Sequence, residues 1–107
     1  MHFDKEKFAE KAELLKVLGH PVRLCIVAGL LEHRCNVTRM QECLNLPQST
    51  VSQHLAVLKA NGVIKGERNG LEICYRVINP DAERIVRLFM ESKGESDESK
   101  GEADEEQ

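Results

Sequence analysis

The sequence predicts one small, mainly α domain of about five helices with a single β-hairpin. Apolar residues recur with helical spacing in five stretches of the first 90 residues. The third and fourth of these stretches are separated only by the short connection Asn45-Leu46-Pro47. After them, Asn69-Gly70 divides two strand-like runs, and Asn-Gly in that setting is a strong hairpin signal. A chain of 107 residues with 41% hydrophobic content suffices for one domain with a modest core.

Two helices open the domain. Asp4 can cap a first helix that runs to about Leu18, and Pro21 can open a second helix that runs to about Glu32. The first helix has a charged, solvated face opposite an apolar stripe that includes Phe8, Ala12 and Leu15. Apolar side chains spread around most of the second helix, so we expect it to be the central buried helix.

The next two helices predict a helix-turn-helix arrangement. Thr38 and Gln41 form a capping-box pattern in the first of them, and Pro47 suits the first position of the second. One face of the second helix should pack on the core through Val51, Leu55 and Leu58. The opposite face has small and amide side chains and no carboxylate. In a helix-turn-helix protein the second helix enters the DNA major groove.

The hairpin should have strands at about 63–68 and 71–77. A two-residue Asn-Gly turn predicts a register that pairs Arg68 with Leu71, Lys65 with Cys74, and Ile64 with Tyr75. One face would then pack on the core through Ile64, Leu71, Ile73, Tyr75 and Val77. The other face would be wet and carry Lys65, Glu67, Glu72, Cys74 and Arg76. A basic ribbon beside a groove-reading helix is a wing, which can reach phosphates or a minor groove.

The last helix should start at Asn79-Pro80-Asp81, with a cap and a proline in the first turn. Residues 91–107 hold eight acidic residues against two lysines, which predicts a disordered acidic tail. Residues 1–90 hold thirteen Lys and Arg against ten Asp and Glu, a net charge of +3, although the whole chain has −3. We therefore expect residues 1–90 to form the DNA-binding domain. They should also form the dimerisation domain, because the apolar faces of the first and last helices exceed what one small domain can bury and would be covered by a second copy. The tail at 91–107 either improves solubility or competes with DNA for the basic surface.

From about residue 12 to 88, the chain resembles the ArsR/SmtB family of bacterial winged helix-turn-helix repressors. The matching residues are 18–24, 46–55, 62–64 and 70–75, together with Leu58. The string Gln48-Ser49-Thr50-Val51-Ser52-Gln53-His54-Leu55 is highly specific to that family. The resemblance implies a homodimer formed through the first and last helices, which binds a palindromic operator and represses transcription. The chain also resembles the subgroup of this family that lacks the usual metal ligands.

The residues that we expect to read or position DNA lie on the second helix of the pair: Gln48, Ser49, Thr50, Ser52, Gln53 and His54. His54 differs from the others because it falls beside the core face of that helix. Phosphates should be held by Lys59, Lys65, Arg68, Asn69 and Arg76. The alternative function is a winged-helix protein-interaction module without specific DNA binding. No phosphate loop, catalytic Ser/His/Asp set or paired carboxylates occur, so we expect no enzyme and no cofactor.

A metal site is not expected. The resemblance places the cysteine pair of the family's arsenic and cadmium sensors near Asn36 and Thr38, which are not ligands of that kind. Its zinc sensors carry Asp-x-His on the last helix, where this chain has Asp81-Ala82-Glu83. The sequence also indicates no small-molecule ligand.

Four cysteines without an export signal or a membrane-length apolar run indicate a reducing cytoplasm. Cys25 and Cys43 occupy helix positions typical of a core, whereas Cys35 should be partly exposed beside the helix-turn-helix. Cys74 would lie opposite Lys65, whose ammonium would favour the thiolate. Two interpretations stay open: four incidental thiols, or a redox switch with Cys35 as the leading candidate.

Overall fold

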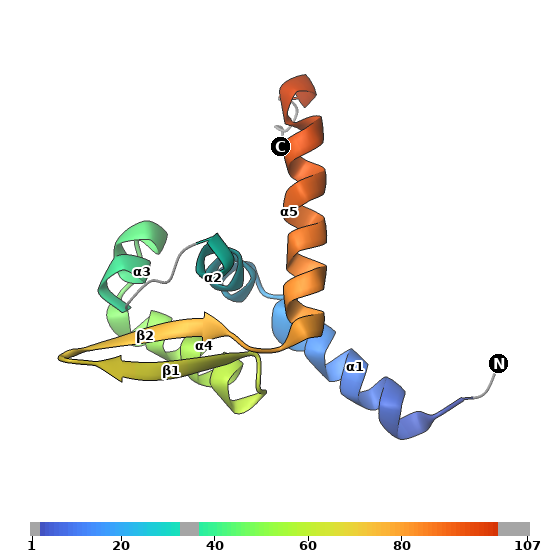
Figure 1. Ribbon diagram of the computed structural model, residues 1–107, viewed down its shortest axis with the longest axis horizontal. Coiled ribbons are helices and arrows are strands. Elements are labelled where there is room, and N and C mark those ends of the chain that lie inside the picture. Colours follow the sequence, from blue (N-terminus) through green and yellow to red (C-terminus); the bar gives the residue numbers. More distant parts are fainter. Residues whose placement is uncertain (1–2, 33–36, 101–107) are drawn as a thin grey trace.

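The computed structural model describes the backbone of residues 3–32 and 37–100 and the side chains of residues 3–32, 40–42 and 44–91. The elements, in order, are α1 (Lys5–Leu18), α2 (Pro21–Glu32), α3 (Val37–Leu44), α4 (Gln48–Ala60), β1 (Ile64–Asn69), β2 (Glu72–Val77) and α5 (Pro80–Lys100). In Figure 1 the β1–β2 hairpin projects to one side, with α4 beside it, while the far end of α5 projects beyond the other elements and α1 extends away from them. The predicted fold class, five helices with one hairpin, is confirmed.

Helix α2 is the centre of the core, as the sequence predicts. It packs against α1, α4, β2 and α5, and Ile26, Val27 and Leu30 are buried. The predicted core face of α4 is also confirmed. The buried residues that complete the core from α4, the hairpin and α5 include Val51, Leu55, Leu58, Val63, Ile64, Tyr75, Ala82 and Val86.

The starts of α1 and α5 have the predicted caps. The Asp4 carboxylate accepts a hydrogen bond from the Lys7 amide at 3.1 Å. Asn79 Oδ1 accepts from the amides of Asp81 and Ala82 at 2.9 and 3.0 Å, and Pro80 is the first residue of α5. These side chains satisfy amides that have no partner within the helix.

The turn between α3 and α4 is built on Asn45, whose φ of 58° lies in the left-handed region. The amides of Asn45 and Leu46 both donate to the Gln41 carbonyl oxygen, at 2.8 and 3.4 Å. Helix α4 starts at Gln48, and Pro47 precedes it as the N-cap with an extended ψ of 148°. Pro47 is therefore not the first helical residue, a difference of one position. The predicted capping-box residue Thr38 lies outside the described side chains.

The end of α4 connects directly to the hairpin. Gly62 has a φ of +72°, its amide donates to the Lys59 carbonyl at 3.0 Å, and the Val63 amide donates to the Leu58 carbonyl at 2.9 Å. This pair of bonds is a Schellman motif, which the Asn61-Gly62 sequence predicts. Because Val63 and Ile64 are buried directly after it, the motif fixes the hairpin relative to α4.

The register of the hairpin differs from the prediction by two residues. Asn69 pairs with Glu72, Arg68 with Ile73 and Ile64 with Val77. The turn residues are thus Gly70 and Leu71, and only Gly70 has a positive φ, +72°. A type I′ turn at Asn69-Gly70 would need positive φ at both of its central residues, whereas glycine first and a negative φ second fits type II′.

A shift of two residues keeps every side chain on its predicted face except at the tip. Leu71, predicted in the core, is 99% exposed because it is a turn residue. Gly66 lies opposite Tyr75 on the core face, and a Cβ at Gly66 would come within 2.9 Å of Tyr75 Cε1. The register therefore matches a residue without a side chain to the buried aromatic ring.

Helix α5 continues to Lys100, without a break at residue 90. Composition predicts disorder from residue 91, yet Glu and Lys are also good helix formers. The division into a folded domain and an acidic tail stays a prediction, and residues 101–107 lie outside the described residues. No single helix among the described residues is long and apolar enough to cross a membrane; α1 and α2 meet that criterion only jointly, with a bend of 91° between them.

Candidate nucleic-acid interface

Helix α4 presents a continuous exposed face that contains most of the predicted reading residues. Gln48, Ser49, Ser52 and Gln53 are exposed, and so are Ala56 and Lys59 further along the helix. Thr50 is half-buried on the flank. The face has no acidic side chain from Gln48 to Ala60. Small and amide side chains let a helix approach another surface closely and can hydrogen-bond to base edges or phosphates.

His54 does not share this orientation. Its ring lies 4.5 Å from that of His20, between centroids, and its Nδ1 accepts a hydrogen bond from Arg23 Nη1 at 3.3 Å. Burial, followed by the charges of His20 and Arg23, lowers the pKa of His54 below its usual value. The structure thus places His54 against the start of α2, away from the other predicted reading residues.

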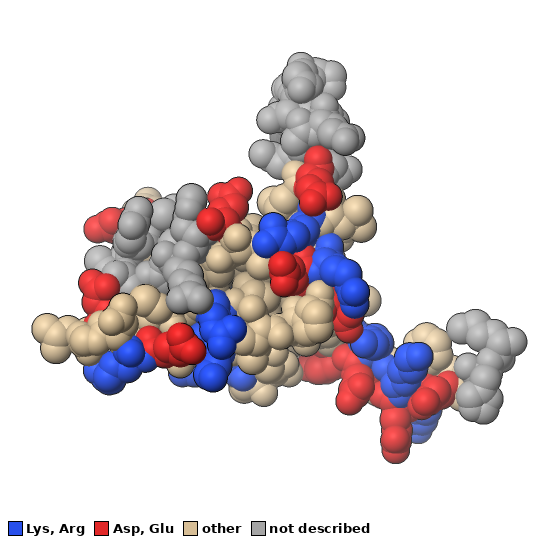
Figure 2. Space-filling model, in the orientation of Figure 1, with Lys and Arg blue, Asp and Glu red and all other residues tan. Residues whose placement is uncertain are grey.

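The hairpin supplies the predicted cations. Lys65 and Arg68 are exposed, and Arg76 is half-buried on the same strand pair. Figure 2 shows Lys and Arg side chains (blue) over the hairpin, with acidic side chains (red) between them. In the observed register Lys65 lies directly opposite Arg76, and one acidic neighbour, Glu67, reaches Arg76 at 3.6 Å. Like charges directly opposite each other are destabilising, and the Glu67 carboxylate offsets part of the charge of Arg76. The predicted register would not have revealed that Lys65 and Arg76 are paired.

Asn69 and Leu71 form the tip of the hairpin with Gly70. Asn69 is exposed, as predicted for a wing contact, and Leu71 is nearly free of protein neighbours. The prediction of Leu71 in the core is wrong because the turn lies one residue later, at Gly70-Leu71, than the Asn69-Gly70 sequence predicts. The signal that could have located it is Gly70 itself, because glycine at the first central position is typical of a type II′ turn.

The cysteines are placed differently from the predictions. Cys25 is exposed on α2, not in the core, because Ile26, Val27 and Leu30 turn the opposite side of the helix inward. Cys74 is half-buried and pairs with Glu67 rather than Lys65, so no ammonium lies opposite its thiol. Cys35 and the Cys43 side chain lie outside the described residues. Within the described part of the chain, no group of three His, Cys, Asp or Glu residues could hold a metal ion.

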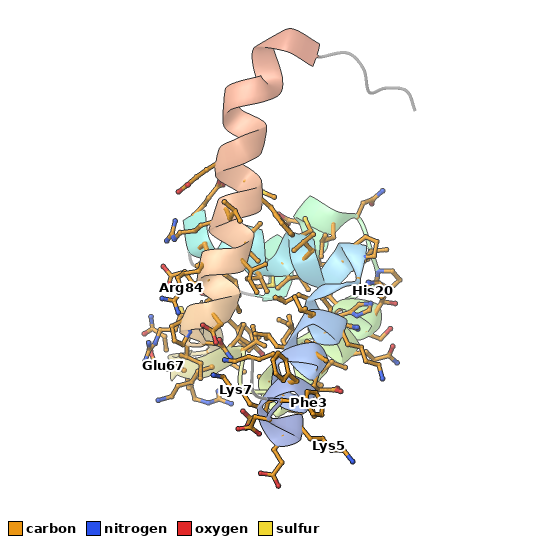
Figure 3. All side chains as sticks on the ribbon, turned by 90° about the vertical axis from the view of Figure 1, so that its right-hand side faces the viewer. Phe3, Lys5, Lys7, His20, Glu67 and Arg84 are labelled. Atoms are coloured by element: carbon orange, nitrogen blue, oxygen red, sulfur yellow. The ribbon has the colours of Figure 1, made fainter. Side chains whose placement is uncertain are left out.

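Helices α1 and α5 carry apolar side chains that this chain leaves exposed: Phe8, Leu15, Leu88, Phe89 and Met90. A salt bridge connects the two helices, with Lys11 Nζ 2.7 Å from Asp81 Oδ2. The hydrogen bond between them raises the pKa of Lys11 and lowers the pKa of Asp81, which Arg84 also contacts at 2.8 Å. Figure 3 views the molecule from this side, with Arg84 on α5 above the free end of α1, where Phe3, Lys5 and Lys7 lie.

Known proteins share both the sequence and the fold. Residues 20–65 match the family model described as bacterial regulatory protein, arsR family. The transcriptional repressor PagR of Bacillus anthracis is 50% identical over 81 residues, which cover 75% of this chain and 81% of PagR. The HTH-type transcriptional repressor SmtB of Mycobacterium tuberculosis is 43% identical over 83 residues, covering 78% of this chain and 62% of SmtB. The crystal structure of PagR superposes with a TM-score of 0.73 at 46% identity, covering 80% of this chain and 99% of that chain.

The matched region includes the turn between α3 and α4, the start of the wing, and helix α4 with the exposed face described above. This likeness in sequence and in fold extends over most of the length of PagR. The chain therefore belongs to the ArsR family of bacterial regulatory proteins, and it is a helix-turn-helix transcriptional regulator rather than an enzyme.

Proposed function

We propose that this regulator is a repressor that binds a palindromic operator as a homodimer, with α4 in the major groove and the β1–β2 hairpin on the backbone. The observation that carries this proposal is the exposed, acid-free face of α4 beside the Lys65–Arg76 pair. Phosphates would offset the repulsion within that pair, and the small side chains of α4 would let the helix enter the groove. Repression is supported by the names of PagR and SmtB.

The proposed contacts divide by chemistry. Gln48, Ser49, Ser52 and Gln53 would meet base edges or nearby phosphates, with Thr50 on the flank of the helix. Lys59, Lys65, Arg68 and Arg76 would neutralise phosphates, and Asn69 would contact the backbone from the tip of the hairpin. Phosphate contacts fix the orientation of the protein, whereas contacts to base edges set its sequence preference.

A homodimer through α1 and α5 would cover the apolar side chains that stay exposed on both helices. A two-fold axis there would present two copies of α4 to successive major grooves, about one helical turn or 34 Å apart. Such an arrangement requires a palindromic site. The partner in this proposal is double-stranded DNA. The proposed compartment is the cytoplasm, as the cysteine usage indicates.

We also propose that thiol oxidation changes the affinity for DNA. Cys25 is exposed and Cys74 lies on the wet face of the wing, so both are accessible to oxidant. Cys35, which the sequence favours as the leading candidate, would act by repositioning the helix-turn-helix. Single Cys→Ser substitutions would show which of these thiols is responsible for the change in affinity on oxidation.

The deciding experiment measures affinity for the chain's own promoter DNA and for a scrambled duplex at one salt concentration, before and after mild thiol oxidation. Preference for the promoter by the reduced protein is expected, with weaker binding after oxidation. Preference that oxidation does not change would contradict the redox proposal alone. Equal affinity for both duplexes would instead favour the alternative, a protein-interaction module without specific DNA binding.

A further inference from the structure

Three side chains join the start of α2 to the reading helix α4. Arg23 donates from Nε to the carbonyl oxygen of Val17, at the end of α1, at 2.7 Å. It donates from Nη1 to His54 Nδ1 on α4 at 3.3 Å, and the ring of His54 packs on that of His20 with 4.5 Å between centroids. One guanidinium therefore connects three helices, and we call His20, Arg23 and His54 the His–Arg cluster. His20 is labelled in Figure 3, at the side where α2 begins.

Both imidazoles in the cluster accept at Nδ1. His20 Nδ1 accepts from the Val22 amide at 3.1 Å, so it caps α2, and His54 Nδ1 accepts from Arg23. An amide and a guanidinium are donors only, hence each ring must be without a proton at Nδ1. Protonating His54 would set donor against donor, with the Arg23 guanidinium only 3.3 Å from Nδ1, and would place two cations side by side.

The position of His54 makes the cluster relevant to DNA. His54 directly follows the exposed Gln53 and precedes the buried Leu55, so it lies on the flank of α4 between the reading face and the core. Leu55 and its apolar neighbours hold α4 on the core through contacts that are not directional. A directional hydrogen bond on the flank resists rotation, because its energy depends on angle.

We propose that His20 and Arg23 act through His54 as positioning residues, which hold α4 in the rotation that lets Gln53 and its neighbours read the operator. This inference rests on the proposed function. The role differs from DNA contact in the atom that it uses, because Nδ1 of His54 accepts from Arg23 within the protein. Helix α4 packs on α2, α3 and β1. Among the described residues, the charges that lower the pKa of His54 belong to Arg23 on α2 and to His20, the residue before α2. The charged side chains described on α3 and β1 are not among them.

The test is a double-mutant cycle on promoter preference, defined as the affinity for promoter DNA divided by that for a scrambled duplex. Arg23→Gln and His54→Leu should each reduce this preference roughly fivefold or more. The double variant should lose no more preference than the single variant with the larger loss. Arg68→Ala, on the wing, is the matched control: it should weaken binding to both duplexes alike, so that combining it with Arg23→Gln leaves the loss of promoter preference equal to that of Arg23→Gln alone. Additive effects of Arg23→Gln and His54→Leu would overturn the proposal, because they would indicate two independent contacts.

The pH profile supplies a second readout that lost packing alone would not change. Promoter preference of the parent should fall between pH 7.5 and 5.5, and His54→Gln, which keeps an acceptor that cannot be protonated, should fall less. A rise in affinity on acidification would instead indicate that protonated His54 binds a phosphate, which contradicts the proposal.

Titration of the histidines by NMR in the absence of DNA guards against variants that fold poorly. Arg23→Gln should raise the pKa of His54 in a protein that still unfolds cooperatively, and an unchanged titration would overturn the proposal. If the parent itself prefers no promoter, the proposed function fails together with this inference. A preference that survives both substitutions overturns the inference alone.

Discussion

Gln53 and Arg68 represent the two kinds of DNA contact at the scale of single residues, and their removal should have different effects. Gln53→Ala should reduce the discrimination between promoter and scrambled DNA, because an amide at the groove contacts base edges. Arg68→Ala should weaken binding to all sequences and reduce the slope of log affinity against log salt by about one. Both side chains are exposed, so unfolding of either variant should match the parent. Titrations at several salt concentrations check the contrast, and equal loss on both duplexes for Gln53→Ala would contradict it.

His54 should make the stability of the protein depend on pH. Burial and the charges of His20 and Arg23 lower its pKa in the folded state, so the unfolded chain, with a histidine pKa of about 6.5, binds this proton more tightly. The contribution of His54 is therefore complete above about pH 6.5 and is lost as the pH falls through the lower, folded-state pKa. Urea unfolding at pH 7.5 and 5.5 measures the effect. His54→Gln should lose less stability on acidification, and an equal loss would contradict the assignment.

At the scale of elements, the hairpin tests whether Gly66 or the turn sequence determines the register. Gly66→Ala should destabilise the fold by about 1–3 kcal/mol, because the added methyl group would overlap the ring of the buried Tyr75. Leu71→Ser, the comparison variant, should change the unfolding free energy by less than about 0.5 kcal/mol, since Leu71 is almost completely exposed. Denaturant unfolding of both variants is the measurement. A large loss for Leu71→Ser would favour the register that Asn69-Gly70 predicts.

The helix ends explain why most elements could be predicted from sequence. Asp4, Asn79 and Gly62 each act on amides or carbonyls within five positions along the chain, so the local sequence contains both partners. Within the hairpin, by contrast, two turn types suit the sequence Asn69-Gly70-Leu71, and they differ by two residues in register. The buried ring of Tyr75 opposite Gly66 favours the observed one.

At the scale of the whole molecule, the exposed apolar side chains of α1 and α5 predict a dimer. Leu88 on α5 is 62% exposed, and Leu88→Asp should leave the chain monomeric, with a strong loss of promoter affinity, because a carboxylate would be buried without a partner. Leu71→Asp is the control for oligomeric state, since Leu71 is an equally apolar and more exposed leucine on the wing. Sedimentation at micromolar concentration distinguishes the two variants. A dimer that survives Leu88→Asp would place the interface elsewhere.

Local sequence specifies the helices, the turn between α3 and α4, the hairpin and the acid-free face of α4, since each depends on periodicity or on partners a few residues apart. The register of the wing, the exposure of Cys25 and the contact of His20 and Arg23 with His54 depend instead on tertiary packing. Arg23 and His54 are 31 residues apart, and their contact depends on how α2 packs against α4. No local pattern specifies that packing, because it results from the side-chain volumes of the whole core.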